Sequence, residues 1–290
     1  MNLQEHIPLG PKTTMRIGGN ARWYADLLTK EDAEEAVRFA EGKNIPLIIL
    51  GGGSNTVFAD GTIGALVARI TADAVSFQEN ALTVEAGKPL ASLVNDCAKR
   101  GLDLSPLTGI PGTVGGAIAG NAGQGPKGIW IDHFVESVDT YIHGEWRPFT
   151  RGACCFSYRK SQFHKHHASR LPLIWSAILS APSRPPADIQ ADIDRLLRKR
   201  IETQPYCRTA GSCFKTAGVS PAWKLIDAAG LRGKSFGDIT ISGKHANFLI
   251  NDGNATFADA VEAVQTIRRA IPEPLDVEMR FVQNDGTLLF

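Results

Sequence analysis

The stretch GIPGTVGGAIAGNAG, residues 109–123, carries six glycines and no charged side chain. Glycine at this density either lets the backbone approach a bulky polar ligand closely or supplies turns with positive φ. The spacing is neither G-x-G-x-x-G nor G-x-x-x-x-G-K-S/T, which excludes a Rossmann fingerprint and a Walker loop. Taken alone, the stretch fits both a tightly packed turn and a ligand-binding loop.

A second glycine cluster favours the ligand-binding interpretation. Gly51, Gly52, Gly53, Ser54 and Asn55 directly follow the apolar run IPLIIL at residues 45–50. A short apolar run that ends in such a cluster predicts a buried strand, which opens into a loop of available N–H groups. Such a loop suits a diphosphate. Two neutral glycine-rich loops therefore predict a dinucleotide that is held mostly by backbone.

The composition bounds the class of protein. The 290 residues suffice for two or three domains, and a net charge of +1 gives no basic surface for nucleic acid. No apolar run approaches the length of a membrane span, and the first ten residues do not resemble a signal peptide. The five cysteines are odd in number and show no C-x-x-C spacing. This pattern indicates reduced thiols and favours neither a disulfide framework nor a zinc site. We therefore expect a cytoplasmic protein without nucleic-acid or membrane partners.

The histidine cluster at residues 164–167 (HKHH) raises the question of a metal. It lies in a Lys-rich polar stretch with no carboxylate nearby in the sequence. A solvated loop explains it better, so we expect no metal site.

Hydrophobic periodicity and capping residues predict an alternation of helices and strands. Thr29 to Asp32 and Thr256 to Asp259 form capping boxes, and we expect the first helix to end at Gly42. Residues 181–186 (APSRPP) indicate a linker. The expected helices are 29–42, 89–100, 188–203, 221–229 and 256–270, and the expected strands are 45–50, 65–70, 82–86, 134–141, 145–149, 248–250 and 275–282.

The last of these strands alternates between apolar and charged residues. One face carries Leu275, Val277, Met279 and Phe281, and the other carries Asp276, Glu278 and Arg280. His245 and Asn247 likewise share one face if the segment HANFLIN is extended, and that face fits either a polar cleft wall or an ordinary sheet surface.

Four residues at three places in the sequence are candidates for chemistry, and each place also has an ordinary structural explanation. Arg159 is either a surface arginine or a fixed guanidinium that stabilises an oxyanion or a carboxylate. Ser212, in the segment AGSCFK, is either a turn residue or a proton donor, and hydrolase chemistry has no support because no G-x-S-x-G occurs. Glu278 and Arg280 share one strand face, which carries either a cross-strand salt bridge on a solvated surface or part of a site.

These pieces, in this order, resemble the family of UDP-N-acetylenolpyruvoylglucosamine reductases, also called UDP-N-acetylmuramate dehydrogenases. The resemblance runs from about Thr13 to Phe281. It is carried by TTMRIGG (13–19), LGGGSN (50–55), GIPGTVGGA (109–117), NAG (121–123), YRKS (158–161), QP (204–205), GSCFK (211–215), HANF (245–248) and EMR (278–280).

The resemblance implies an α+β fold, with a two-part FAD-binding domain of the vanillyl-alcohol-oxidase type and a C-terminal α+β substrate-binding domain. We expect the FAD-binding subdomains at residues 1–70 and 71–181 and the substrate-binding domain at residues 187–290. FAD would be bound non-covalently, since the glycine loops offer no His or Cys at a familiar attachment position.

The resemblance also implies a mechanism. NADPH reduces the flavin, and UDP-N-acetylenolpyruvoylglucosamine then enters the same cleft and receives hydride at C3. Ser212 would protonate C2, and Arg159 with Glu278 would stabilise the enolate-like intermediate. Tyr158, Lys215 and Arg280 would bind substrate. The FAD-binding residues would be Gly51, Gly52, Gly53, Ser54, Asn55, Gly109, Ile110, Pro111, Gly112, Thr113, Gly115, Gly116, Gly120, Asn121, Gly123 and His245.

The chain departs from the family pattern at several places. Thr216-Ala217 stands where the family usually has Asn-Pro, and Gln124-Gly125-Pro126 where it often has Ala-Tyr-Gly. The short spacing from Arg159 to Ser212 indicates the subclass without the inserted tyrosine loop. Because all three candidate catalytic residues are present, we expect an active enzyme. We expect it to be a monomer or a weak oligomer.

Two other functions remain open from the sequence. An oxidase on the same flavin fold would react quickly with oxygen and would not need NADPH. A non-catalytic nucleotide-sugar-binding protein would bind UDP ligands with FAD absent or inert, although the retained Arg159, Ser212 and Glu278 argue against it.

Overall fold

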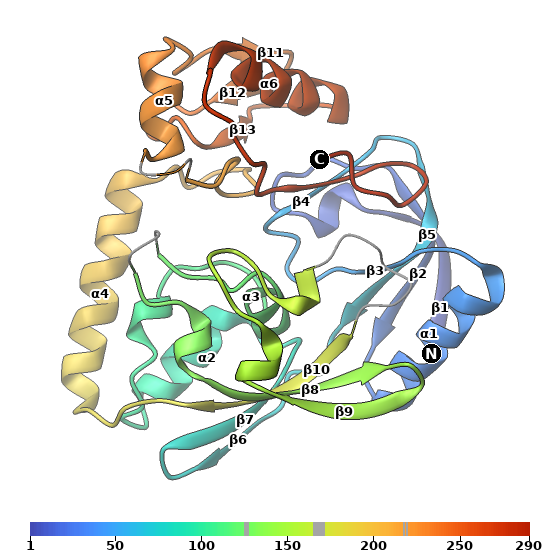
Figure 1. Cartoon of the computed structure of the whole chain (residues 1–290), viewed down its shortest axis with the longest axis vertical. Helices are drawn as coiled ribbons and strands as arrows, with labels where there is room; N and C mark the ends of the chain where they lie inside the picture. Colours follow the sequence, from blue (N-terminus) through green and yellow to red (C-terminus); the bar gives the residue numbers. More distant parts are fainter. Residues whose placement is uncertain (125–127, 165–171, 217, 219) are drawn as a thin grey trace. The chain divides into compact units, whose positions relative to one another are not determined.

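The computed structural model describes residues 1–124, 128–164, 172–216, 218 and 220–290 (Figure 1). Contacts divide the chain into two compact units. The first unit comprises Met1–Gln4, Tyr24–Gly52 and Leu66–Arg200, and the second comprises Glu5–Trp23, Gly53–Ala65 and Ile201–Phe290. Within the described ranges, no helix combines the length and the apolar character needed to cross a membrane. The expected domain limits at residues 70, 181 and 187 stay a prediction.

A four-stranded sheet has the order β1-β2-β5-β3, and three of its strands have residues in both units. The short β3 runs parallel to β5, with Leu47 opposite Leu66. This confirms the expected strands at 45–50 and 65–70. The bounds are Asn2–Pro8 for β1, Asn20–Leu27 for β2, Leu47–Ile49 for β3 and Thr62–Ile70 for β5.

Helix α1 (Lys30–Lys43) begins at the predicted capping box. The Thr29 hydroxyl accepts the Asp32 N–H, and the Asp32 carboxylate accepts the Thr29 N–H. The predicted end at Gly42 is wrong: the helix runs on to Lys43, and Asn44 adopts the left-handed conformation that closes it. Asn tolerates this conformation better than most residues, which is why it serves where a glycine was expected.

A five-stranded antiparallel sheet lies in the first unit, in the order β6-β7-β10-β8-β9 (Figure 1). Its bounds are Val75–Gln78, Ala81–Glu85, Leu173–Ser180, Val135–Ile142 and Glu145–Thr150, in that order. The β8–β9 hairpin turns through His143 and Gly144, which both have positive φ, as a two-residue hairpin turn favours. The predicted hairpin is thus confirmed.

One helix of the first unit precedes the glycine-rich stretch 109–123, and another lies inside it. Helix α2 spans Leu90–Ala98 and α3 spans Val114–Ala119, and α3 packs against β7 and β10. Helix α4 (Pro186–Thr203) begins at the last residue of the predicted linker, before the expected start at Asp188. Its expected apolar side is buried only in its first half, since Leu197 and Ile201 are 44% and 52% exposed.

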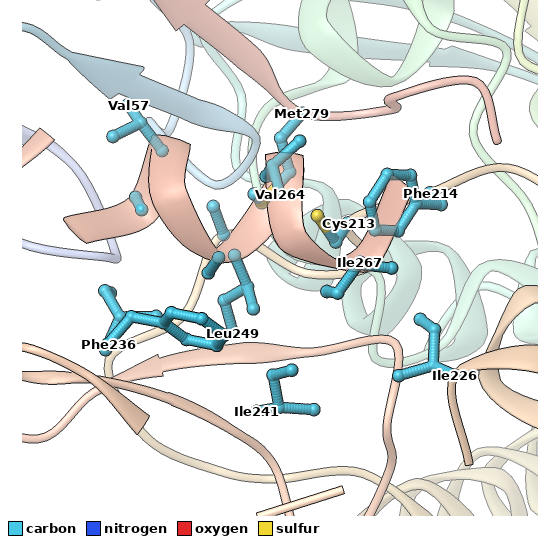
Figure 2. Close-up of a cluster of buried hydrophobic side chains, with 14 of the residues drawn as sticks. Val57, Cys213, Phe214, Ile226, Phe236, Ile241, Leu249, Val264, Ile267 and Met279 are labelled. Carbon is cyan, nitrogen blue, oxygen red and sulfur yellow. The ribbon is translucent and has the colours of Figure 1, made fainter. Parts of the chain in front are cut away.

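The second unit has its own hydrophobic core (Figure 2). Helix α6 (Phe257–Ala270) faces it with Ala260, Ala263, Val264 and Ile267, at the spacing of one helix face. Thr256 forms the predicted capping box at its start. The other elements are β4 (Thr56–Phe58), α5 (Ala222–Ala228), β11 (Ser235–Phe236), β12 (Ile239–Ile241), β13 (Leu249–Asn251) and β14 (Arg280–Val282).

The predicted last strand, residues 275–282, is wrong in its extent. Strand β14 covers only Arg280–Val282 and pairs in parallel with β4. Before it, Val277 makes an isolated bridge to Phe214. The predicted alternation survives in the burial, because Leu275, Met279 and Phe281 are buried and Asp276 is exposed. Residues 275–279 leave the ladder because their neighbour is the irregular segment around Phe214.

Glycine is required at some positions of this fold and dispensable at others. An alanine Cβ at Gly123 would lie 2.0 Å from Trp130 Cδ1, whereas one at Gly42 meets no atom within 4 Å. We expect Gly123→Ala to lower the free energy of unfolding by about 1–3 kcal/mol through steric strain. Gly42→Ala should raise it by roughly 0.5–1 kcal/mol, because it removes a glycine from a helix.

The measurement is the urea midpoint of each variant, with Gly42→Ala as the matched control. Equal midpoints for Gly123→Ala and the wild type would contradict the close packing of Gly123 against Trp130.

Candidate functional site

The two glycine clusters meet in the first unit. A Cβ on Gly52 would lie 2.7 Å from the Cα of Gly112, and one on Gly51 would lie 2.8 Å from Thr113 Oγ1. Real Cβ atoms do not approach other atoms this closely, so the two backbones can pack together only because these residues are glycine. The predicted ligand-binding loops are therefore packed on each other.

Backbone N–H groups are available in one of these loops. Among the described residues, no protein acceptor takes the N–H of Gly51 or Gly52. The first turn of α3 differs, because Lys88 O accepts the Val114 N–H and Ala86 O accepts the Gly115 N–H, both at 2.9 Å. Available N–H donors of the kind that bind a diphosphate thus lie at Gly51 and Gly52, and the dinucleotide expected at these residues stays a prediction.

Asn55 ends the first glycine cluster and belongs to the second unit. Its side-chain Nδ2 donates to Glu278 O at 3.0 Å, and its carbonyl accepts the Arg280 N–H at 2.9 Å. It therefore fixes the backbone on both sides of Met279. The sequence pattern did not indicate this contact, because Asn55 and Glu278 are 223 positions apart.

Arg159 is held by the end of the glycine-rich stretch 109–123. Its guanidinium donates to Gly123 O at 2.7 Å and to Asn121 O at 3.3 Å. Asn121 is fully buried, and its Nδ2 donates to Ser157 O at 3.0 Å. Arg159 has a φ of 53°, a left-handed conformation that costs a non-glycine residue free energy. These contacts fix the direction of one cation in the first unit.

Ser212 and Glu278 lie on neighbouring segments of the second unit. Cys213 O accepts the Glu278 N–H at 2.8 Å, and Ser212 itself bridges to Phe248. Gly211, just before Ser212, has a φ of 80° that only glycine adopts readily. Both candidate side chains are half-buried. The structure thus brings two of the three predicted catalytic residues onto adjacent backbone.

Cys213 does not compete with Ser212 as a reactive group. Burial first, and the nearby Glu278 carboxylate second, raise the pKa of the Cys213 thiol well above its ordinary value. The thiol stays protonated at neutral pH and, with no exposed surface, serves as a core side chain.

The prediction that His245 and Asn247 share an extended face is wrong. Residues 245–248 form a turn, in which Phe248 N–H donates to His245 O at 3.0 Å. Asn247 is buried, and its side chain accepts the Phe214 N–H at 3.0 Å and donates to Phe214 O at 2.8 Å. Asn247 therefore pairs with backbone and does not line a cleft wall. Short turns formed by Asn compete with strand pairing, and tertiary contacts decide between them.

His245 is held by rings and by its own turn. Its ring lies 4.9 Å from the Phe248 ring and 6.1 Å from the Trp223 ring, centroid to centroid. Nδ1 accepts the Asn247 N–H at 3.3 Å. Burial lowers the pKa of His245 below its ordinary value, so the imidazole is neutral at pH 7.

The remaining predicted residues divide between the units. Tyr158 lies in the first unit, with its ring 5.8 Å from that of Trp130. Lys215 and Arg280 lie in the second, both half-buried. Desolvation lowers the pKa of the Arg280 guanidinium, which still stays charged at neutral pH.

The histidine cluster lies mostly outside the described residues, because only His164 of residues 164–167 is described. In the part of the chain that is described, no group of His, Cys, Asp and Glu side chains could hold a metal ion.

Comparison with known proteins identifies relatives over nearly the whole chain. A family model described as the C-terminal domain of UDP-N-acetylenolpyruvoylglucosamine reductase matches residues 203–281, and one described as an FAD binding domain matches residues 24–141. The reductase of Synechococcus sp. (strain WH7803) is 33% identical, over 93% of this chain and 89% of its own. That of Chlamydia muridarum is 34% identical, over 97% and 95%.

A solved structure agrees with these sequence relatives. The crystal structure of UDP-N-acetylenolpyruvylglucosamine reductase from Thermus caldophilus superimposes with a TM-score of 0.82 at 30% identity. It covers 97% of this chain and 98% of its own. Together with the FAD binding model, it confirms the predicted α+β fold with an FAD-binding part of the vanillyl-alcohol-oxidase type.

The lowered pKa of His245 predicts a pH dependence of stability. Below its ordinary pKa of 6.5, the unfolded chain takes up a proton that the folded chain does not yet bind. The free energy of unfolding should therefore fall as the pH drops from about 7.5 to 5.5. The free energy of unfolding of His245→Gln should fall less over this range. Urea titrations of both proteins at the two pH values measure the difference.

The exposed His143 provides the control, since His143→Gln should keep the wild-type dependence. A dependence in His245→Gln as steep as that of the wild type would show that His245 is not the group responsible.

Proposed function

The chain belongs to the family of UDP-N-acetylenolpyruvoylglucosamine reductases, and we propose which of its residues carry out the family's reaction. The protein is a flavin-dependent oxidoreductase. It reduces UDP-N-acetylenolpyruvoylglucosamine to UDP-N-acetylmuramate in peptidoglycan precursor synthesis, with FAD as cofactor and NADPH as reductant.

FAD, when bound, supplies the hydride chemistry, and the chain supplies its binding. In our proposal Gly51 and Gly52 offer N–H groups to the diphosphate, and the stretch 109–123 gives close backbone contact. The free N–H groups and the missing side chains support this assignment. Gly53, Ser54, Asn55 and His245, which lie in the second unit, complete the proposed set.

Ser212 is the proposed proton donor. Hydride addition at C3 of the enolpyruvyl group leaves negative charge on C2 and its carboxylate, so C2 must gain a proton. The Ser212 hydroxyl gives that proton, and the neighbouring Cys213 thiol remains in the core. The observation that carries the proposal is the pairing of the Ser212 and Glu278 segments, joined at Cys213 O and the Glu278 N–H.

Arg159 and Glu278 stabilise the charge that forms on the substrate. A guanidinium that already donates to two backbone carbonyls needs little reorganisation when charge develops, which favours this role for Arg159. Tyr158, Lys215 and Arg280 bind the substrate, and the two cations among them suit its diphosphate and carboxylate. In our proposal NADPH and the substrate enter the same site in turn.

The alternative functions have less support. The named relatives are reductases, and this favours neither an oxygen-reactive oxidase nor a binding protein without redox chemistry. The retention of Arg159, Ser212 and Glu278 also favours an active enzyme.

We also propose a cytoplasmic location and a role in cell-wall growth, and hence in cell shape and division. All five cysteines are free, and Cys155 and Cys207 are exposed, which suits a reducing compartment.

The Ser212 assignment predicts a defect in one half-reaction only. Ser212→Ala should allow NADPH to reduce the flavin within about twofold of the wild-type rate. Reoxidation by the enolpyruvyl substrate should slow by about 10²–10⁴-fold, because the proton donor is gone. Anaerobic stopped-flow absorbance at the flavin bands measures both rates. Ser235→Ala, at an exposed serine of β11, is the control; wild-type reoxidation in Ser212→Ala would refute the assignment.

A monomeric or weakly associating state predicts a mass near 31.2 kDa by light scattering at micromolar concentration. A mass that stays at twice this value on dilution would contradict the proposal.

A further inference from the structure

The segment that carries Ser212 is not part of a regular strand. Its two ends make only isolated bridges, Ser212 to Phe248 and Phe214 to Val277. The backbone groups between them are buried with the core side chains of Cys213 and Phe214, and a buried backbone group without a partner costs free energy. Backbone bonds from the Glu278 N–H to Cys213 O and from the Lys215 N–H to Asp276 O hold one side of this segment, and the polar groups of Phe214 need another partner.

Asn247 supplies that support through three hydrogen bonds. Its carbonyl accepts the Cys213 N–H at 2.8 Å. Its side-chain Oδ1 accepts the Phe214 N–H at 3.0 Å, and its Nδ2 donates to Phe214 O at 2.8 Å. The side chain thus contacts both polar groups of one residue, as an adjacent strand would.

Asn247 is itself fixed by a closed turn. Ser242 Oγ accepts the N–H groups of Lys244 and His245, at 3.1 and 3.2 Å. Ser242 N–H donates to Phe248 O at 2.9 Å, which closes the loop behind Asn247. Asn247 is 7% exposed, so water does not compete strongly for its amide.

We infer that Asn247 is a positioning residue for the proton transfer, and that it acts through the backbone of Ser212, Cys213 and Phe214. This inference rests on the proposed role of Ser212. A misplacement of a reacting group by about 1 Å can cost on the order of 100-fold in rate. The Asn247 amide therefore sets the distance from the Ser212 hydroxyl to the substrate.

The test is Asn247→Asp in the FAD-loaded full-length enzyme. The new carboxylate can still accept the Phe214 N–H, but it cannot donate to Phe214 O and repels that oxygen. We expect flavin reduction by NADPH within about twofold of wild type, and reoxidation by UDP-N-acetylenolpyruvoylglucosamine slowed about 10- to 100-fold. The solvent deuterium isotope effect on reoxidation should increase, because proton transfer becomes more rate-limiting.

Asn254→Asp is the matched control, with the same chemical change at an exposed asparagine of the second unit. It should leave both half-reactions unchanged. Asn247→Ser is the second variant, used where the carboxylate prevents folding, and it should show the same split because its shorter side chain loses the two-point contact.

A double variant separates positioning from general support of the fold. If Asn247 acts through Ser212, Ser212→Ala with Asn247→Asp should reoxidise within about twofold of Ser212→Ala alone, since the two changes then remove one function. The inference would be overturned if the rate losses of the two single variants multiplied in the double variant. It would also be overturned if Asn247→Asp slowed both half-reactions equally.

The outcomes also distinguish this inference from the proposed function. Normal reoxidation in Ser212→Ala would remove the proton-donor role itself. Slow reoxidation in Ser212→Ala together with normal reoxidation in both Asn247 variants would leave that role intact and overturn only the positioning.

Discussion

The close approach of two backbones at Gly52 and Gly112 is the constraint on which the first unit depends. A Cβ on Gly52 would overlap the Gly112 Cα, and relieving such an overlap would cost about 1–3 kcal/mol. The contact holds the loop after β3 against the start of α3. Among the described residues, no protein acceptor takes the N–H groups of Gly51 and Gly52. At the other end of the stretch 109–123, the carbonyls of Asn121 and Gly123 accept hydrogen bonds from Arg159.

In the second unit, side-chain amides order irregular backbone that is buried in the core. Asn55 and Asn247 each use a side-chain amide where a strand would use a ladder bond. A buried backbone group left unpaired costs about 1–3 kcal/mol, so these amides are valuable even though each bond contributes only about 1 kcal/mol net. Irregular backbone allows the segments that carry Ser212 and Glu278 to lie next to each other, joined at Cys213 O and the Glu278 N–H, and the side-chain amides make that backbone more rigid.

Much of the fold could be predicted from the sequence, because local signals decide it. The capping boxes at Thr29 and Thr256 located two helices, and His143-Gly144 located a hairpin. The last strand was predicted too long, because apolar alternation does not reveal whether a partner strand is present. The turn at residues 245–248 was missed for a related reason, since the partner of Asn247 is Phe214, 33 positions earlier.

For the candidate site, the sequence indicated the residues but not the contacts that hold them. The glycine clusters and the family motifs indicated which residues to consider, including Arg159, Ser212 and Glu278. The sequence did not indicate that Asn121 and Gly123 hold Arg159, or that protein carbonyls already occupy the first N–H groups of α3. Such contacts join residues that are distant along the chain, and only the packed structure brings them together.

The reductase cycle is tested by an anaerobic visible spectrum of the purified wild-type protein, recorded before and after NADPH is added and again after UDP-N-acetylenolpyruvoylglucosamine is added. For a reductase we expect flavin bands that NADPH bleaches and that return, without oxygen, when the substrate is added. A protein without flavin, or a flavin that ignores NADPH or returns only with oxygen, would contradict the reductase cycle.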